Sequence, residues 1–207
     1  MIHTVREMVA KTAGESTARE RLLAAADELF YSEGVHVVGI DRIVERAGVA
    51  KASLYSIFGS KDELVRAYLE THFRQRQGSI ARILAAHGTA RGRLLGMFAE
   101  IEGALEVSDW RGCRFILASA ESRRDDASEL VAQEYRAWIR SVFTDLAAEA
   151  GARNSKEVGR QLHLLYDGAA VAARMEKDRP GAAKALRSAA VAMLDAAIPP
   201  KRTRRAR

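Results

Sequence analysis

Helical periodicity runs through most of the chain and is interrupted at short intervals by residues that begin or end helices. Alanine, leucine, arginine and glutamate dominate the sequence, and all four favour the helical conformation. No segment shows the sustained alternation that a half-buried strand requires, and the nearest candidate is the short Val-His-Val-Val run at 35–38. The sequence therefore predicts an all-α fold.

Capping signals and apolar spacing set the expected helix boundaries. The segments Thr17-Ala18-Arg19-Glu20 and Ser60-Lys61-Asp62-Glu63 each fit a capping box, in which a hydroxyl and a carboxylate bind unpaired backbone N–H groups. Gly34, Gly48 and Gly59 are placed to end helices. Nine helices are expected, at about 17–33, 40–47, 51–58, 60–87, 90–107, 113–123, 128–150, 154–175 and 180–198.

The formal net charge of +6 is concentrated at the C-terminus. The last seven residues, KRTRRAR, contain five of the 33 basic residues and no acidic one, which leaves 28 basic against 27 acidic residues elsewhere. Residues 1–61 contain eight of each sign. Net charge alone therefore does not indicate a nucleic-acid partner, and the basic tail is expected to be either a solvated extension or a supplementary DNA-binding arm.

Composition excludes several classes of protein. One cysteine and five scattered histidines support neither a disulfide scaffold nor a metal site, so no metal or other cofactor is expected. The sequence has no apolar run of about 18 residues that would span a membrane, and its first residues lack the apolar segment of a signal peptide. We therefore expect a cytoplasmic protein without a membrane partner.

The segment 40–58 has the pattern of a helix-turn-helix. Its two short helices are joined by Ala47-Gly48-Val49-Ala50, where glycine permits the positive φ that such a turn needs. Six apolar side chains are expected to pack the pair onto the first helix: Ile40, Ile43, Val44, Val49, Leu54 and Phe58. The outer face of the helix at 51–58 is then left with small and polar residues, which can enter the major groove and reach phosphates and base edges.

Residues 17–64 resemble the DNA-binding domain of the tetracycline repressor-like (TetR) regulators. The resemblance is carried by Leu29-Phe30…Gly34, Ile43-Val44…Ala47-Gly48-Val49, Leu54-Tyr55…Phe58 and Ser60-Lys61-Asp62-Glu63-Leu64. The remaining two thirds of the chain is similar to the family in being all-helical and of matching length.

The resemblance implies a set of DNA-contacting residues. Tyr55 and Lys61 would bind phosphates, and Thr17 would bind a flanking phosphate. Ser53 would bind phosphate or base, and Lys51 could reach O6 and N7 of a guanine. The full expected set is Thr17, Gly39, Arg42, Lys51, Ala52, Ser53, Tyr55, Ser56, Ile57 and Lys61.

Three positions depart from the family pattern. Gly39 stands where the family often has a serine or threonine, so a side-chain phosphate contact is lost. Ile57 replaces a common histidine and offers only an apolar contact, such as one to a thymine methyl. Ala50 replaces a frequent serine or threonine N-cap, which should cost about 1 kcal/mol of helix stability.

The resemblance also implies a domain organisation and a function. We expect an N-terminal arm at 1–16, a DNA-binding domain at 17–64, a helical effector-binding and dimerisation domain at 65–198, and a basic tail at 199–207. Such a protein would not be an enzyme. It would be a homodimeric repressor that binds a palindromic operator in double-stranded DNA and is released by a small-molecule effector.

Two alternatives remain open from the sequence. One is a DNA-binding regulator or activator that responds to no effector. The other is a helical enzyme or binding protein whose helix-turn-helix is incidental, although no nucleophile–base pair, metal spacing or phosphate loop supports it.

Residues of the larger domain supply candidates for the effector pocket and the dimer interface. The pocket candidates either line a cavity or simply fill a core, and they are Phe73, Phe98, Ile101, Leu105, Trp110, Phe115, Tyr135, Trp138, His163 and Tyr166. The last two helices are rich in alanine and present wide apolar faces, which favours a four-helix dimer interface of the kind the family forms. The interface candidates are Val158, Leu162, Leu165, Ala169, Ala172, Leu186, Ala190, Met193 and Leu194.

Overall fold

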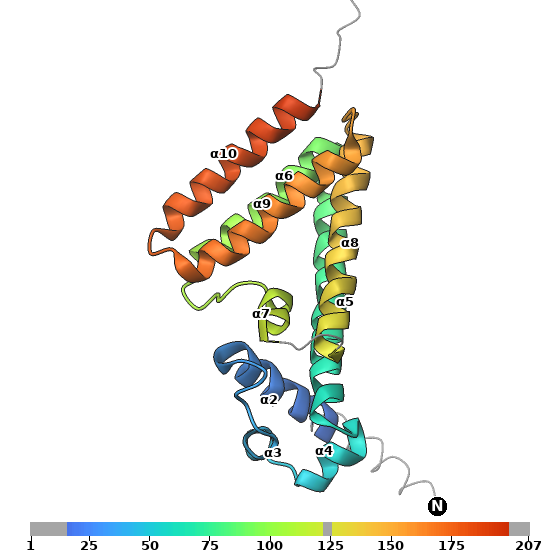
Figure 1. Ribbon diagram of the computed structural model, residues 1–207, viewed down its shortest axis with the longest axis vertical. Coiled ribbons are helices and arrows are strands. Elements are labelled where there is room, and N and C mark those ends of the chain that lie inside the picture. Colours follow the sequence, from blue (N-terminus) through green and yellow to red (C-terminus); the bar gives the residue numbers. More distant parts are fainter. Residues whose placement is uncertain (1–15, 122–125, 199–207) are drawn as a thin grey trace, which may run out of the picture. The chain divides into compact units, whose positions relative to one another are not determined.

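A computed structural model describes residues 16–121 and 126–198, and within these ranges the chain forms nine α-helices and no strand (Figure 1). The all-α prediction is therefore confirmed. The chain divides into two compact units, Met1–Tyr68 and Leu69–Arg207. The predicted basic tail at 199–207 and all but the last residue of the predicted N-terminal arm at 1–16 lie outside the described residues.

The first unit contains α2 (Ala18–Glu33), α3 (Ile40–Ala47), α4 (Lys51–Phe58) and the first turns of α5 (Lys61–Ala86). Its core is formed by fully or almost fully buried side chains, which are Leu22, Ala26, Phe30, Val38, Ile43, Leu54, Leu64 and Tyr68. The rings of Phe30 and Tyr68 meet edge to face at 5.5 Å between centroids. Three helices are thus packed around one apolar centre that α5 completes.

The predicted start of the first helix is confirmed at atomic detail. The Thr17 backbone N–H donates to Glu20 Oε2 at 2.7 Å, and the Glu20 N–H donates to Thr17 Oγ1 at 3.2 Å, which completes the capping box. At the second predicted box only one half is seen, because the Glu63 N–H donates to Ser60 Oγ at 3.1 Å while the Glu63 carboxylate pairs with Arg66.

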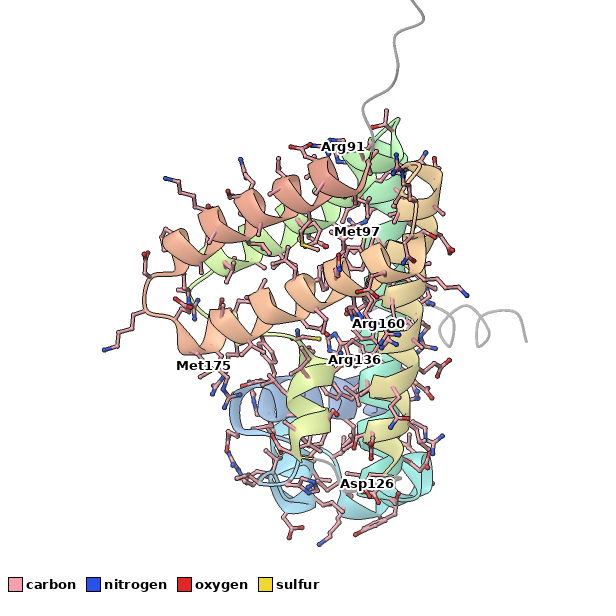
Figure 2. The ribbon with its side chains drawn as sticks, turned by 45° about the horizontal axis from the view of Figure 1, so that its top comes forward. Arg91, Met97, Asp126, Arg136, Arg160 and Met175 are labelled. Atoms are coloured by element: carbon pink, nitrogen blue, oxygen red, sulfur yellow. The ribbon has the colours of Figure 1, made fainter. Side chains whose placement is uncertain are left out.

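The second unit contains the rest of α5 together with α6 (Ala90–Glu106), α7 (Arg114–Glu121), α8 (Ala127–Glu149), α9 (Ser155–Met175) and α10 (Arg179–Ala197). Helices α8 and α9 form a closely packed pair, and α10 packs against α6 and α9 (Figure 1). Met97 on α6 is fully buried, whereas Met175 at the end of α9 points into solvent (Figure 2).

Side-chain caps fix three helix starts in this unit. Thr89 caps α6, Asn154 caps α9 and Asp178 caps α10, each by accepting a hydrogen bond from a backbone N–H three residues later. Such caps satisfy donors that a helix leaves unpaired. No helix in the ranges described is long and apolar enough to cross a membrane.

Candidate DNA-binding surface and ligand cavities

The turn between α3 and α4 gives α4 its orientation. Gly48 adopts φ +62° and its N–H donates to the carbonyls of Val44 and Glu45, so α3 ends in a left-handed residue that suits glycine. Helix α4 is then anchored by Leu54, which is fully buried. The opposite side of α4 remains open to solvent.

All ten predicted DNA-contact positions are exposed or half-buried on the first unit. Lys51, Ala52, Tyr55, Ser56 and Ile57 form the open face of α4, and Tyr55 is 46% exposed. Thr17, Gly39 and Arg42 are exposed, while Ser53 and Lys61 are half-buried. Lys61 Nζ donates to the His36 carbonyl at 3.5 Å, which places the ammonium beside the loop that precedes α3.

Carboxylates already bind two of the predicted DNA-contacting cations. Arg42 forms two hydrogen bonds to Glu33, one of them at 2.8 Å, and Lys51 Nζ lies 2.8 Å from Asp41 Oδ1. The hydrogen bond from Arg42 lowers the pKa of Glu33, and the bond to Asp41 raises the pKa of Lys51, so Glu33 and Lys51 are both charged at neutral pH. DNA would therefore meet these cations as ion pairs and not as free charges.

The larger unit contains a half-open pocket of about 380 Å³, here called the inner cavity. Five of the predicted pocket residues line it: Ile101, Trp110, Phe115, Tyr135 and Tyr166. The rings of Phe115 and Tyr135 stack with centroids 3.8 Å apart. Burial raises the pKa of the Tyr135 hydroxyl and of the Cys113 thiol, so both groups are neutral in the cavity wall.

The other predicted pocket residues do not line the inner cavity. Phe73 and Trp138 pack against the aromatic rings of the cavity wall. Leu105 and His163 are buried in the core. Phe98 lines a different groove, described below.

Sequence reasoning missed the polar side of the inner cavity. Arg76 donates to the Tyr166 hydroxyl and lies 2.5 Å from Glu100 Oε2, while Ser79 Oγ donates to Glu100 Oε1 at 2.6 Å. Asp167 also faces the cavity and pairs with Arg136 of α8 at 2.7 Å. The sequence carries a signal for this polar side, because positions 72, 75, 76, 79 and 82 of α5 are polar or basic and share one helical face.

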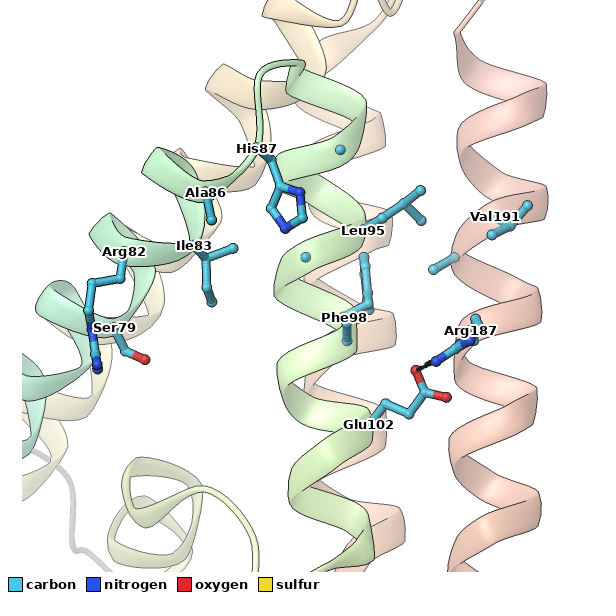
Figure 3. Close-up of a pocket in the computed structure, with 14 residues that line it drawn as sticks. Ser79, Arg82, Ile83, Ala86, His87, Leu95, Phe98, Glu102, Arg187 and Val191 are labelled. Carbon is cyan, nitrogen blue, oxygen red and sulfur yellow. Dashed lines mark hydrogen bonds and ion pairs between the residues drawn. The ribbon is translucent and has the colours of Figure 1, made fainter.

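A second hollow in this unit is an open groove of about 760 Å³ between α5, α6 and α10, here called the outer groove (Figure 3). Ser79 and Arg82 line both the outer groove and the inner cavity. The face of α5 that lines the inner cavity therefore continues along the outer groove.

Most of the predicted dimer-interface residues belong to the core of the subunit itself. Six of them are buried within one chain and have little surface left for a partner, namely Val158, Leu162, Ala169, Leu186, Ala190 and Leu194. Leu165, Ala172 and Met193 are half-buried. The large apolar side chains that α9 does expose are Leu164, Val171 and Met175.

Comparisons with known proteins agree with this architecture. A family model described as bacterial regulatory proteins, tetR family, matches residues 22–68. The crystal structure of a TetR-family transcriptional regulator from Streptomyces coelicolor is 31% identical, with a TM-score of 0.83, over 87% of this chain and 95% of that chain.

Two curated relatives are named as transcriptional regulators of opposite effect. The transcriptional activator FasR of Mycolicibacterium smegmatis is 31% identical over 133 residues, and the match spans 64% of this chain but only 60% of FasR. The transcriptional repressor KstR2 of Rhodococcus jostii is 28% identical over 185 residues, which cover 82% of this chain and 84% of KstR2. With the helix-turn-helix of α3 and α4 and the match along almost all of the Streptomyces coelicolor structure, these findings show that the chain belongs to the TetR family of transcriptional regulators, which are not enzymes.

Proposed function

We propose that this protein is a homodimeric repressor that binds a palindromic operator in the cytoplasm and leaves it when a small molecule binds. The observation that carries the proposal is the outer face of α4. Leu54 anchors the inner face of this helix in the core, and small, hydroxylated and basic residues on the outer face are open to solvent. A helix of this kind fits the major groove. Two such helices in a two-fold dimer would read half-sites about 34 Å apart or a multiple of that distance.

The dimer would form through α9 and α10. Leu164, Val171 and Met175 follow one another at helical spacing and are 61%, 43% and 77% exposed. Helix α10 exposes a row of small residues, Ala185, Ser188 and Ala192, which allows another helix to approach closely. Two such helices from each subunit would bury these faces in a four-helix interface.

The inner cavity is the proposed effector site. Its volume lies within the range of roughly 300–1,000 Å³ that is typical of small-molecule sites. Helix α5 supplies much of its wall and also begins in the DNA-binding unit at Lys61. An effector that shifts α5 would therefore alter the DNA-binding unit, and moving operator occupancy from 99:1 to 1:99 requires about 10⁴-fold tighter binding to the DNA-free state.

The test is selection of duplexes from a random-sequence pool by the purified full-length protein, followed by footprinting of the selected sequence. We expect one inverted repeat, and a promoter carrying that repeat should be transcribed less when the protein is added. Lys51→Ala should weaken binding, whereas Lys156→Ala on α9 of the other unit serves as the matched control and should not. Selection of no repeat would reject operator recognition, and increased transcription would make the protein an activator.

A further inference from the structure

The outer groove has the dimensions of a binding site for an extended ligand. Helix α6 forms its floor, and α5 and α10 form its two walls (Figure 3). The floor residues run from Gly92 to Glu102, which corresponds to about 15 Å along a helix. The volume of about 760 Å³ is twice that of the inner cavity and lies in the range of small-molecule sites.

The floor of the groove carries several small residues. Gly92, Gly96 and Ala99 share one face of α6 at spacings of four and three. A Cβ at Gly96 would lie 2.6 Å from His87 Nε2 and 2.9 Å from Ile83 Cγ2, so these two side chains lie directly beside this glycine. Leu95 of α6 and Val191 of α10 add apolar surface, and the channel is therefore mostly hydrocarbon.

The charges along the groove favour an anion. Glu102 lies across from Arg187, with Arg187 Nη2 at 2.7 Å and Nε at 2.8 Å from Glu102 Oε2, so these two charges neutralise each other. Arg82 is exposed and forms no hydrogen bond or ion pair with any other residue in the described parts of the chain. One guanidinium is thus left on the α5 wall, and a guanidinium binds a carboxylate or phosphate in a two-point contact.

We propose that the outer groove binds a single-chain amphipathic acid, with its acidic group on Arg82 and its alkyl chain along the floor between Glu102 and Gly92. The floor of about 15 Å matches an extended chain of about twelve carbons. A cationic headgroup would be repelled by Arg82 and would find no free carboxylate, because the one carboxylate that lines the groove is already paired with Arg187. The ligand class follows from this combination of an apolar channel and a single unpaired cation.

The proposed dimer would leave this groove open. Arg187 and Val191 of α10 line the groove. The residues that directly follow them, Ser188 and Ala192, belong to the exposed row that we assign to the dimer face. Successive residues of a helix differ by about 100° in direction. The groove and the proposed dimer face therefore occupy different sides of α10, and ligand binding does not require dissociation.

Isothermal titration of the full-length protein with dodecanoate, dodecyl phosphate, dodecan-1-ol and dodecyltrimethylammonium, all below their micelle concentrations, tests the headgroup. Both acids should bind about tenfold more tightly than the alcohol, and the cation more weakly still. The affinity for dodecanoate should exceed the affinity for hexanoate by roughly threefold to fourfold for each added methylene, until the channel is full.

Two variants locate the ligand. Arg82→Gln should remove the preference for the acids, whereas Arg74→Gln, an exposed arginine of α5 that does not line the groove, is the matched control and should bind as the natural protein does. Ala99→Trp fills an exposed position on the floor and should lower dodecanoate affinity at least tenfold without changing the melting temperature.

The proposal is overturned if all four headgroups bind equally, if none binds, if Arg82→Gln retains the preference for the acids, or if Ala99→Trp retains full affinity, which would place the chain in the inner cavity that Arg82 also lines or at another site. These outcomes are separate from operator recognition, because duplex selection by the same protein needs no ligand. A protein that selects an inverted repeat but ignores amphipathic acids would keep the proposed function and lose this inference.

Discussion

Tyr55 is an aromatic residue with nearly half of its surface in water, although the neighbouring Leu54 is fully buried. Its hydroxyl faces the side of α4 that we propose to meet DNA, where it can donate a hydrogen bond to a phosphate oxygen. Tyr55→Phe keeps the ring and removes only that donor. We expect operator affinity to fall about tenfold while the free energy of unfolding stays unchanged.

Fluorescence anisotropy with the selected duplex measures the Tyr55→Phe effect, and urea unfolding provides the stability control. Equal affinity of the two proteins would show that the ring packs at the DNA surface without a phosphate bond.

His163 is a buried base that folding keeps neutral. Burial, together with the charges of Arg136 and Arg140, lowers its pKa from 6.5 to about 4. Its Nδ1 accepts from Arg140 Nε at 3.5 Å, and its Nε2 lies 3.5 Å from Asp167 Oδ2. The unfolded chain binds a proton between pH 6.5 and 4 that the folded chain does not, so stability falls as the pH decreases through this window.

His163→Gln retains hydrogen-bonding groups and cannot titrate. Between pH 7.5 and pH 5, we expect the free energy of unfolding to fall by roughly 2 kcal/mol more in the natural protein than in the variant. The reason is that the histidine pKa differs by two to three units between the folded and the unfolded chain. Urea unfolding at the two pH values measures this difference. Identical pH dependence in both would contradict a depressed histidine pKa.

At the scale of the helix, α2 and α4 differ in how they begin. Thr17 caps α2 with its side chain, whereas Ala50 precedes α4 with extended backbone angles of −68° and 146° but offers no side-chain acceptor. Ala50→Ser should therefore stabilise the protein by about 1 kcal/mol, and Thr17→Ala should destabilise it by about the same amount. Urea unfolding at constant protein concentration measures both, and a destabilising Ala50→Ser would mean that the serine does not adopt the capping rotamer.

These same capping signals explain why the helices were predictable from the sequence. Thr17, Asn154 and Pro180 mark helix starts through local hydrogen bonds or a fixed φ, and such effects require no knowledge of the tertiary fold. The helix-turn-helix was equally readable, because Gly48 and Leu54 specify the turn and the buried side within a few residues.

The faces of α9 were not predictable in the same way. Leu162 and Leu164 are both apolar and lie two residues apart, yet Leu162 is fully buried and Leu164 is 61% exposed. Periodicity identifies apolar residues on a helix but cannot tell whether the same subunit or a partner covers them. The ion pairs Arg42–Glu33 and Lys51–Asp41 escaped prediction for a related reason, since each joins residues of different helices.

At the scale of the whole molecule, charge does not explain DNA recognition. The excess of basic residues lies in the tail at 201–207, and the first 61 residues balance eight basic against eight acidic side chains. Since Arg42 and Lys51 are also paired with carboxylates, few free cations remain to displace counterions from DNA. We expect the slope of log K against log salt for operator binding to be no steeper than about −8 per dimer, and a much steeper slope would contradict this.

Dimer formation is the property on which recognition of a palindrome depends. Val171 lies in the middle of the exposed apolar row of α9, and Val171→Asp places a charge where two subunits would meet. Because Val171 is 43% exposed in the subunit, the fold itself should tolerate the change. We expect the variant to sediment as a monomer with unchanged helical content and to bind the inverted repeat at least a hundredfold more weakly, because each chain then holds a single half-site.

Val107→Asp is the matched control, since Val107 is 49% exposed but follows α6 and not α9 or α10. It should remain dimeric and bind the operator normally, and a dimeric Val171→Asp protein would place the interface on another face.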